Sequence, residues 1–313
     1  MLDKYTGYCV FLGIGVACCD RSDMFSLCQG LGVEMIVCQK ENKGISTRAG
    51  PVLPPLNGVL VGKMMLQHFP STLVAHALDP QQGESILDMC AAPGGKSSHV
   101  ASLVANNATI VSCDRSRKKV LSMRNFFDEL KATCIVPLVL DSTKCIQNDN
   151  SIKNDQKQVC ELISSSPASD KDGLLTVHAF SPESFDRIIL DPPCSALGLR
   201  PKLHIDAKNV HDINKHATYQ KKFVTNAVAL LKKGGTMTYS TCTINSLENE
   251  GMVRYILDEF PVMRLVPIDY DVGLPGLHST SLTDEERGMV RRFDPSDVAD
   301  TIGFFVAKFQ KDC

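Results

Sequence analysis

Short apolar runs alternate with stretches of helical spacing along most of this chain. The runs are rich in Ile, Leu and Val, which predicts strands. Between them, apolar residues recur every three or four positions, as in Val120, Met123, Phe127 and Leu130, which predicts amphipathic helices. The alternation predicts an α/β fold with a doubly wound, mostly parallel sheet. We expect strands at residues 86–88, 108–112, 135–140, 187–190, 236–240, 263–268 and 302–309, and helices at 63–78, from 96 onward, and at 120–130, 218–233 and 245–260.

Three local signals indicate where the predicted helices begin or end. Pro70 marks a break in the helix at 63–78 or the start of a second helix, because proline is tolerated in a first turn. The pair Gly234-Gly235 is expected to stop the helix at 218–233. Asn245 with Glu248 resembles a capping box for the helix that follows.

Residues 85–99 read SILDMCAAPGGKSSH, a strand followed by a turn of small residues and a helix start. Such a turn lets backbone N–H groups approach a nucleotide-like ligand, and the helix N-terminus is electropositive. A phosphate-binding P-loop is disfavoured because Cys90 stands where that motif requires glycine. The alternative interpretation is an ordinary strand-to-helix loop.

An aspartate closes each of the first three predicted strands of the sheet: Asp88, Asp114 and Asp141. The carboxyl ends of parallel strands meet at one edge of the sheet, where open α/β folds bind their ligands. Asp114 lies about 20 residues beyond the glycine turn, the position from which a carboxylate accepts hydrogen bonds from ribose hydroxyls. A surface turn is the alternative for Asp114 taken alone.

Two cysteines follow strands at this same edge. Cys194 comes after Asp191-Pro192-Pro193, and Cys242 comes after the strand at 236–240. A thiolate near a helix start is a good nucleophile, although a single cysteine is often only a small core residue. Two cysteines in equivalent positions favour a chemical role.

Composition limits the kind of partner. The chain has 313 residues, 43% of them hydrophobic, with a formal net charge of -2, so contacts with nucleic acid require local basic patches. The thirteen cysteines contain no C-x-x-C pair, which favours reduced thiols in a cytoplasmic or nuclear protein. Candidate basic patches contain Arg115, Arg117, Lys118 and Lys119 in one group and Arg200 with Lys202 in another.

We expect two domains. Residues 1–51 are too few for an independent core, with strands at 10–17 and 33–37 around a short helix at 24–29. We interpret the apolar run at 7–19, which Gly13 and Gly15 interrupt, as a strand with a turn rather than a secretory leader. The main domain covers 52–313, and its polar segment at 146–174 is expected to be a mobile surface loop.

Five segments resemble successive motifs of the Nop/Sun family of RNA cytosine-5 methyltransferases: DMCAAPGGK, CDRS, LDST, ILDPPCSALGLRP and YSTCTINSLENE. The similarity runs from about Leu53 to the end, where RRFDPSDVADTIGFFVAKF is similar to the tRNA-directed members of the family. The first 50 residues resemble the latter half of an RNA-binding PUA domain. The resemblance implies S-adenosyl-L-methionine as cofactor and RNA as partner, in particular tRNA near its acceptor end.

The resemblance also implies roles for individual residues. In the family a thiolate, here Cys242, adds to C6 of cytosine so that C5 can accept a methyl group. Cys194 would assist loss of the C5 proton and release of the RNA. Asp191 would hydrogen-bond the base, and Lys96 would point into the same pocket. The implied cofactor-binding residues are Cys90, Ala91, Ala92, Pro93, Gly94, Gly95, Lys96, Asp114 on the ribose, Asp141 near the adenine, and Asp191.

The chain departs from the family pattern at two places. Pro192-Pro193 and Ala196 stand in a motif that usually reads DAPCSG, so we expect an altered backbone bend at Ala196. The PUA-like unit lacks its first half, which bears on RNA affinity. Two other functions stay open: a catalytically idle RNA-binding protein, and a methyltransferase for protein or a small molecule, which would not need Cys242. We expect a monomer without metal or membrane contact.

Overall fold

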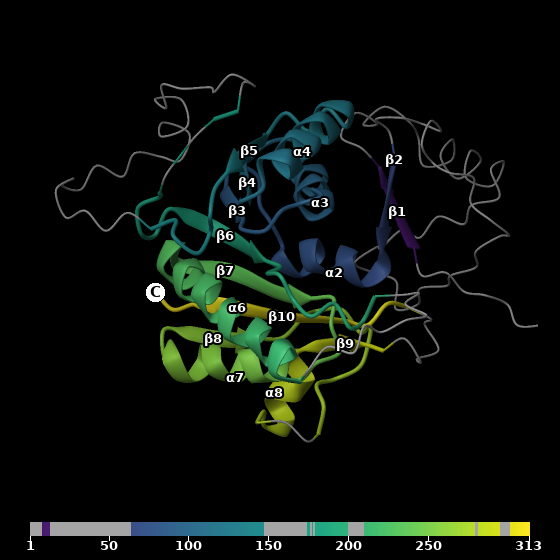
Figure 1. The fold of residues 1–313 in the computed structure, drawn as a ribbon, viewed down its shortest axis with the longest axis vertical. Helices are drawn as coiled ribbons and strands as arrows, with labels where there is room; N and C mark the ends of the chain where they lie inside the picture. Colours follow the sequence, from purple (N-terminus) through teal and green to yellow (C-terminus); the bar gives the residue numbers. More distant parts are fainter. Residues whose placement is uncertain are drawn as a thin grey trace, which may run out of the picture.

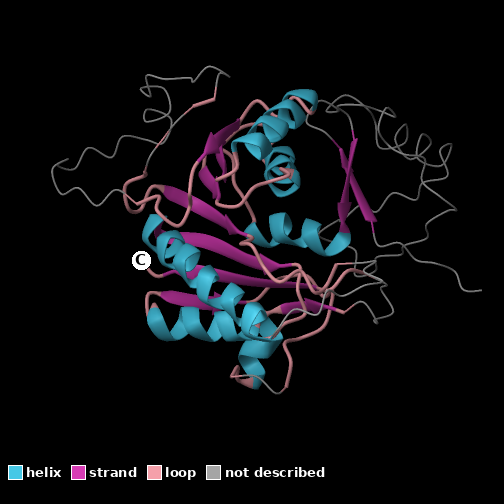
Figure 2. Ribbon diagram, viewed as in Figure 1, coloured by secondary structure: helices cyan, strands magenta, loops and turns pink. Residues whose placement is uncertain are grey.

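The fold is built on one eight-stranded sheet in the order β5-β4-β3-β6-β7-β10-β8, with β9 paired to β10 (Figures 1 and 2). A computed structural model describes residues 8–12, 64–146, 174–175, 177, 179–199, 210–278, 281–294 and 301–313. The strands are β3 (Ser85–Asp88), β4 (Thr109–Asp114), β5 (Ile135–Val139), β6 (Phe185–Leu190), β7 (Leu231–Thr241), β8 (Met263–Val266), β9 (Arg291–Phe293) and β10 (Phe304–Lys311). The helices are α2 (Phe69–Leu78), α3 (Gly95–Leu103), α4 (Arg117–Glu129), α6 (Val210–Leu230), α7 (Glu250–Glu259) and α8 (Asp284–Met289).

Strands β3 to β7 pair in parallel, which confirms the doubly wound, mostly parallel sheet. The chain moves outward from β3 through β4 to β5 and then crosses to β6 on the other side of β3. The turn after β3 and the loop after β6 therefore diverge at a topological switch point, where a crevice opens at the carboxyl ends of the strands.

The last strand runs against this parallel order. β10 lies between β7 and β8 and is antiparallel to both, with Phe305 opposite Thr241. The start of β10 therefore lies beside the end of β7. The first residues of β10 and the last residues of β7 therefore lie at the same edge of the sheet.

Two apolar clusters fill the faces of the sheet. Ile188 and Leu190 of β6 belong to the cluster under α6 and α7, whereas Ile189 belongs to the cluster under α2, α3 and α4. All three side chains are fully buried because helices cover both faces. The apolar runs of the sequence are continuous for the same reason.

Several predicted helix boundaries are wrong. Helix α6 begins at Val210 rather than at 218. Helix α6 ends at Leu230, and Leu231 already pairs with Phe185 as the first residue of β7, so Gly234-Gly235 lies in the strand. A Cβ on Gly235 would lie 2.9 Å from the backbone oxygen of Asp186, so the close approach of β6 requires glycine there. Of the helix predicted at 63–78, the first part is the strand β2 (Met64–His68) and the rest is α2, with Pro70 in its first turn as predicted.

The predicted capping box is also wrong. Helix α7 begins at Glu250, and its N-cap Asn249 makes no side-chain capping bond. Glu248 is instead fully buried, and its carboxylate accepts hydrogen bonds from Ser195 and Gln220 as well as from the side chain of Asn245. A capping box is present at α8, formed by Thr283 and Glu286.

Part of the predicted N-terminal unit pairs with the main domain. Strand β1 (Tyr8–Leu12) is antiparallel to β2, so one small sheet joins residues on both sides of the predicted boundary at 51. The rest of the PUA-like unit and most of the insertion at 146–174 lie outside the described residues. The division into two domains stays a prediction.

The loop after β6 (residues 191–199, the Cys194 loop) is held against its neighbours by backbone contacts. Gly198 donates a hydrogen bond of 3.1 Å to the Cys242 carbonyl and accepts one of 2.9 Å from Gly303. A Cβ on Gly198 would overlap the carbonyl oxygen of Gly303. Ala196 has a φ of 56°, so alanine adopts the left-handed conformation at the position where the family motif has glycine, and the altered bend stays a prediction.

We expect Gly198→Ala to lower the free energy of unfolding by about 2–3 kcal/mol, because backbone on both sides must shift to admit the methyl group. The matched control is Gly288→Ala in α8, where nothing lies within 4 Å of an added Cβ. That variant should gain about 0.5–1 kcal/mol from helix propensity. Urea unfolding of both variants measures the difference, and equal midpoints would contradict the close approach.

Candidate active site

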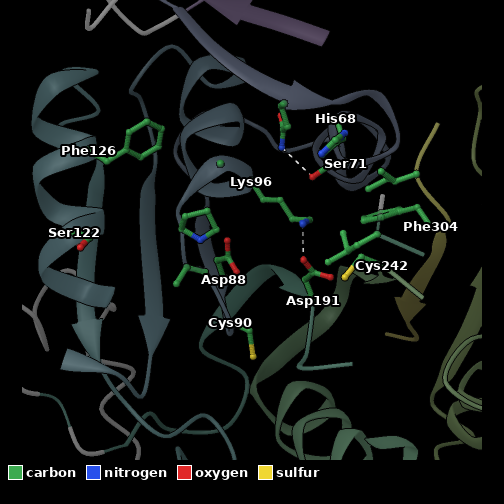
Figure 3. Close-up of a pocket in the computed structure, with 17 residues that line it drawn as sticks. His68, Ser71, Asp88, Cys90, Lys96, Ser122, Phe126, Asp191, Cys242 and Phe304 are labelled. Atoms are coloured by element: carbon green, nitrogen blue, oxygen red, sulfur yellow. Dashed lines mark hydrogen bonds and ion pairs between the residues drawn. The ribbon is translucent and has the colours of Figure 1, made fainter. Parts of the chain in front are cut away.

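A cavity of about 660 Å³ opens at the switch point (Figure 3). Its wall is formed by the turn after β3, the β2–α2 junction, α4, the Cys194 loop, the end of β7 and the start of β10. The lining residues are Gln67, His68, Ser71, Asp88, Cys90, Ala91, Ala92, Pro93, Gly95, Lys96, Ser122, Phe126, Asp191, Leu199, Cys242, Ile302 and Phe304.

The glycine turn forms one wall of the cavity. Cys90, Ala91, Ala92, Pro93, Gly95 and Lys96 line the cavity, as expected for a ligand-binding turn. Gly94 is the N-cap of α3 with a φ of 111°, and a Cβ there would lie 2.7 Å from the ring of Phe127. Glycine is therefore required both by the backbone conformation and by the packing of α4.

Lys96 and Asp191 form an ion pair inside the cavity. Lys96 Nζ lies 2.5 Å from Asp191 Oδ2, and Ser240 Oγ donates a 3.1 Å hydrogen bond to Oδ1. Burial opposes the charge of Lys96, but the Asp191 carboxylate outweighs it and raises the pKa of the ammonium. The ammonium also lies 5.5 Å from the ring centroid of Phe304, so a cation and an aromatic face border the same space.

The two predicted cysteines come together beside this pair. Cys194 Sγ and Cys242 Sγ are 3.4 Å apart, and Cys242 lines the cavity next to Asp191 (Figure 3). Either thiol can donate in this contact. With Cys194 as the donor, the hydrogen bond lowers the pKa of Cys242, and Lys96 acts in the same direction against burial. The same hydrogen bond, together with burial, raises the pKa of Cys194. The directions of the two pKa shifts favour a Cys242 thiolate beside a protonated Cys194.

Asp88 offers a buried acceptor to a ligand. Its Oδ2 accepts a 2.7 Å hydrogen bond from Ser97, which in turn accepts one from Ser112, but Oδ1 is buried without a partner among the described residues. Burial raises the pKa of Asp88 to about 6, against the opposing effects of Ser97 and Lys96. An unpaired carboxylate oxygen in the cavity wall fits a ligand that carries an ammonium group.

Three predicted cofactor residues do not line the cavity: Gly94, Asp114 and Asp141. Asp114 Oδ1 accepts from the backbone of Ser116 at 2.7 Å, and Asp141 Oδ1 accepts from Thr143 Oγ1 at 2.7 Å. Burial raises the pKa of Asp141, but the hydrogen bonds from Thr143 outweigh it and lower the pKa overall. Both aspartates end neighbouring strands at the correct edge, and their contacts with a cofactor stay predictions.

Several of the residues that line the cavity were not predicted from the sequence. Phe304 was expected only as part of a strand, because nothing local shows that the last strand is antiparallel and starts beside Cys242. Gln67, His68 and Ser71 fell in or beside a predicted helix boundary and carry no motif. Burial, followed by the charge of Lys96, lowers the pKa of His68, which favours a neutral imidazole.

Other features of the described residues concern a membrane span, a metal site and the predicted basic patches. None of their helices is long and apolar enough to cross a membrane. Among the same residues, no group of three His, Cys, Asp or Glu side chains could hold a metal ion. Arg115, Lys118 and Lys119 are exposed, whereas Arg200 and Lys202 lie outside the described part of the chain.

The sheet order is that of S-adenosylmethionine-dependent methyltransferases. The chain is similar to the solved structure of NSun6 from Pyrococcus horikoshii with SFG. That structure has a TM-score of 0.64 and 30% identity, covering 84% of this chain and 57% of that chain. The chain belongs to the family described as 16S rRNA methyltransferase RsmB/F, whose model matches residues 75–310. This confirms the resemblance to the Nop/Sun enzymes.

Two curated relatives match nearly the whole chain. The tRNA (cytosine(72)-C(5))-methyltransferase NSUN6 of Mus musculus is 35% identical over 98% of this chain and 63% of its own length. The rRNA (cytosine-C(5))-methyltransferase NOP2C of Arabidopsis thaliana is 35% identical over 96% of this chain and 60% of its own length. The chain thus spans about three fifths of the length of these relatives.

Asp88→Asn should abolish a pH dependence of stability. The folded carboxyl titrates at about 6 against an ordinary value of 3.8, so the folded state binds the proton more tightly. The contribution of Asp88 to the free energy of unfolding should therefore fall by about 3 kcal/mol as pH rises from below 3.8 to above 6, and the wild-type protein should lose this amount relative to Asp88→Asn. Urea unfolding without ligand at a series of pH values measures it, and a wild-type curve parallel to that of Asp88→Asn would contradict the assignment.

Cys242 should be alkylated by iodoacetamide with a midpoint below the ordinary thiol pKa of 9.0. Cys194→Ala removes the hydrogen-bond donor and should shift the midpoint upward. Mass spectrometry of the Cys242 peptide against pH measures both. Cys134, whose pKa burial raises to about 11, is the internal control and should react slowly in both proteins. An unchanged Cys242 midpoint in Cys194→Ala would contradict the contact.

Proposed function

We propose that this chain is an RNA cytosine-5 methyltransferase that uses S-adenosyl-L-methionine and acts on tRNA near the acceptor end. The observation that carries the proposal is the pair of thiols 3.4 Å apart beside the Lys96–Asp191 ion pair. One thiolate can attack a base while the second thiol stays available for the later steps. Neither protein methylation nor methylation of a small molecule needs such a pair.

The protein supplies the covalent part of the reaction. Cys242 forms a bond to C6 of the cytosine, and the electron pair of the C5–C6 bond moves to C5, which becomes nucleophilic. The Asp191 carboxylate accepts a hydrogen bond from the protonated or amino edge of the base, which makes the ring a better electron sink, and Lys96 is the counter-ion of Asp191. After C5 takes the methyl group, its proton leaves with the help of Cys194, and the S–C6 bond breaks to restore Cys242 and the aromatic ring.

The cofactor supplies the activated methyl group when it is bound. The residues that would hold it are those of the turn, Cys90, Ala91, Ala92, Pro93, Gly94, Gly95 and Lys96, together with Asp114, Asp141 and Asp191. We add Asp88, because its unpaired Oδ1 fits the ammonium of the methionine part. Their position at the carboxyl edge of the sheet supports this assignment.

Recognition of RNA is the part of the proposal that depends most on relatives. The NSUN6 relative is named for cytosine 72 of tRNA, and we carry that substrate class to this chain. The target base must leave its stack to reach Cys242. The exposed Arg115, Lys118 and Lys119 can neutralise phosphates, and the PUA-like residues 1–51 would add affinity. We place the protein in the cytoplasm or nucleus as a monomer.

Substitution of each cysteine tests the proposal. Cys242→Ala should abolish methyl transfer to a tRNA transcript while leaving cofactor affinity unchanged. Cys194→Ala should instead accumulate a covalent protein–RNA adduct, seen as a slow-migrating band on a denaturing gel. Cys134→Ala, a partly buried thiol away from the cavity, is the matched control and should methylate normally.

The substrate class needs its own readout. Bisulfite sequencing of a tRNA transcript after reaction should show 5-methylcytosine near the acceptor end, and a ribosomal RNA fragment should stay unmodified. Cofactor binding without methylation of either RNA would favour a catalytically idle RNA-binding protein instead. Turnover by Cys242→Ala would remove this residue from the nucleophile role.

A further inference from the structure

Glu248 is a buried carboxylate that connects the two cysteine loops. It lies in the loop after β7 (residues 242–249, the Cys242 loop), and its exposed fraction is 0%. Because it caps no helix, its burial needs another explanation. A carboxylate is costly to bury unless hydrogen bonds replace its contacts with water.

Four hydrogen bonds converge on the two carboxylate oxygens. Oε2 accepts from the backbone N–H of Ser195 at 2.9 Å and from Gln220 Nε2 at 3.0 Å. Oε1 accepts from Ser195 Oγ at 2.5 Å and from Asn245 Nδ2 at 2.9 Å. A carboxylate has lone pairs for all four donors, whereas a glutamine would turn an NH₂ group toward two of them.

These bonds tie together residues next to the two thiols. Ser195 follows Cys194, Thr243 follows Cys242, and their hydroxyl oxygens are 2.8 Å apart. Glu248 therefore holds the Cys194 loop through Ser195, while its own backbone belongs to the Cys242 loop. The two sulfurs, which are 3.4 Å apart, belong to the residues that directly precede Ser195 and Thr243.

The sheet and α6 hold Glu248 in turn. Tyr239 of β7 is fully buried, and its hydroxyl donates to the backbone oxygen of Glu248 at 2.6 Å. Gln220 of α6 also donates to the carbonyl of Pro193 at 3.1 Å, so it contacts the Cys194 loop directly. The carboxylate is thus the centre of a network that spans both loops and two packed elements.

We propose that Glu248 is a positioning residue that sets the separation of the Cys194 and Cys242 sulfurs, and so couples formation of the RNA adduct to its release. The catalytic consequence rests on the proposed function. The sulfur separation is a property of the protein alone, so it can be measured without RNA.

The test uses phenylarsine oxide, a trivalent arsenical that binds two thiols held a few ångströms apart. Its affinity for Cys194→Ala measures binding to other cysteines, and the excess in the wild-type protein measures the pair. Glu248→Gln should lower this excess affinity by about tenfold or more, because unmatched donors push the loops apart. Cofactor affinity should stay within about twofold of the wild type, since Glu248 does not line the cavity.

Glu84→Gln is the matched control. Glu84 is a partly buried carboxylate that binds Arg187 at 3.0 Å, and it precedes β3 at the opposite end of the sheet. We expect its loss to weaken the fold without changing arsenical affinity. An equal loss of affinity in Glu84→Gln and Glu248→Gln would show a general effect of destabilisation and overturn the proposal.

Ser195→Ala provides a milder second variant. It keeps the backbone donor to Glu248 and removes the hydroxyl that bonds both Glu248 and Thr243. We expect a loss of arsenical affinity of about threefold to tenfold, and this variant decides the question if Glu248→Gln does not fold. Affinity within about twofold of the wild type in Ser195→Ala or in folded Glu248→Gln would overturn the proposal.

Kinetics with tRNA separate this inference from the proposed function. In Glu248→Gln, kcat should fall while the KM for RNA stays constant, because only the thiol geometry has changed. If the wild-type protein methylates no RNA but the arsenical results are as expected, the proposed function fails and the positioning role of Glu248 is still supported.

Discussion

The parallel pairing of β6 with β7 is the constraint on which the site depends. Leu190 lies opposite Tyr239, so the two strands end side by side and their loops leave the sheet together. Asp191 and Ser240 are then close enough for a 3.1 Å hydrogen bond. A shift of β7 by one residue in this register would turn Ser240 to the opposite face and remove its hydrogen bond to Asp191.

The charges in the cavity depend on one another in the same way. Lys96 forms an ion pair with Asp191 and lowers the pKa of Cys242. It also lowers the pKa of Asp88, against the effect of burial. An ammonium in a poorly solvated space acts on each of these groups more strongly than it would in water. The position of Lys96 follows from the glycine turn, because the turn starts α3 and places Lys96 in its first helical turn.

Contacts on both sides of Ala196 stabilise a strained backbone conformation in the Cys194 loop. Ala196 adopts a left-handed conformation that costs about 1–2 kcal/mol in a residue with a side chain. On one side Ser195 is bonded to Glu248, and on the other Gly198 is bonded to Cys242 and Gly303. A strained backbone conformation persists where the surrounding contacts fix it. Here those contacts fix the loop that contains the Cys194 thiol.

The sequence alone determined the parts of this protein that depend on local spacing. The glycine turn, the strand that ends at Asp88 and the two cysteines after strands follow from short runs of residues. The structure places the turn, Asp191 and Cys242 around one cavity, with Cys194 in contact with Cys242. Only the tertiary structure decided that β10 runs antiparallel with Phe304 beside Cys242, that Leu231 continues as strand, and that Glu248 joins two loops. These features depend on pairings between residues far apart in the chain, such as Ser195 with Glu248, and local propensity carries no information about such pairings.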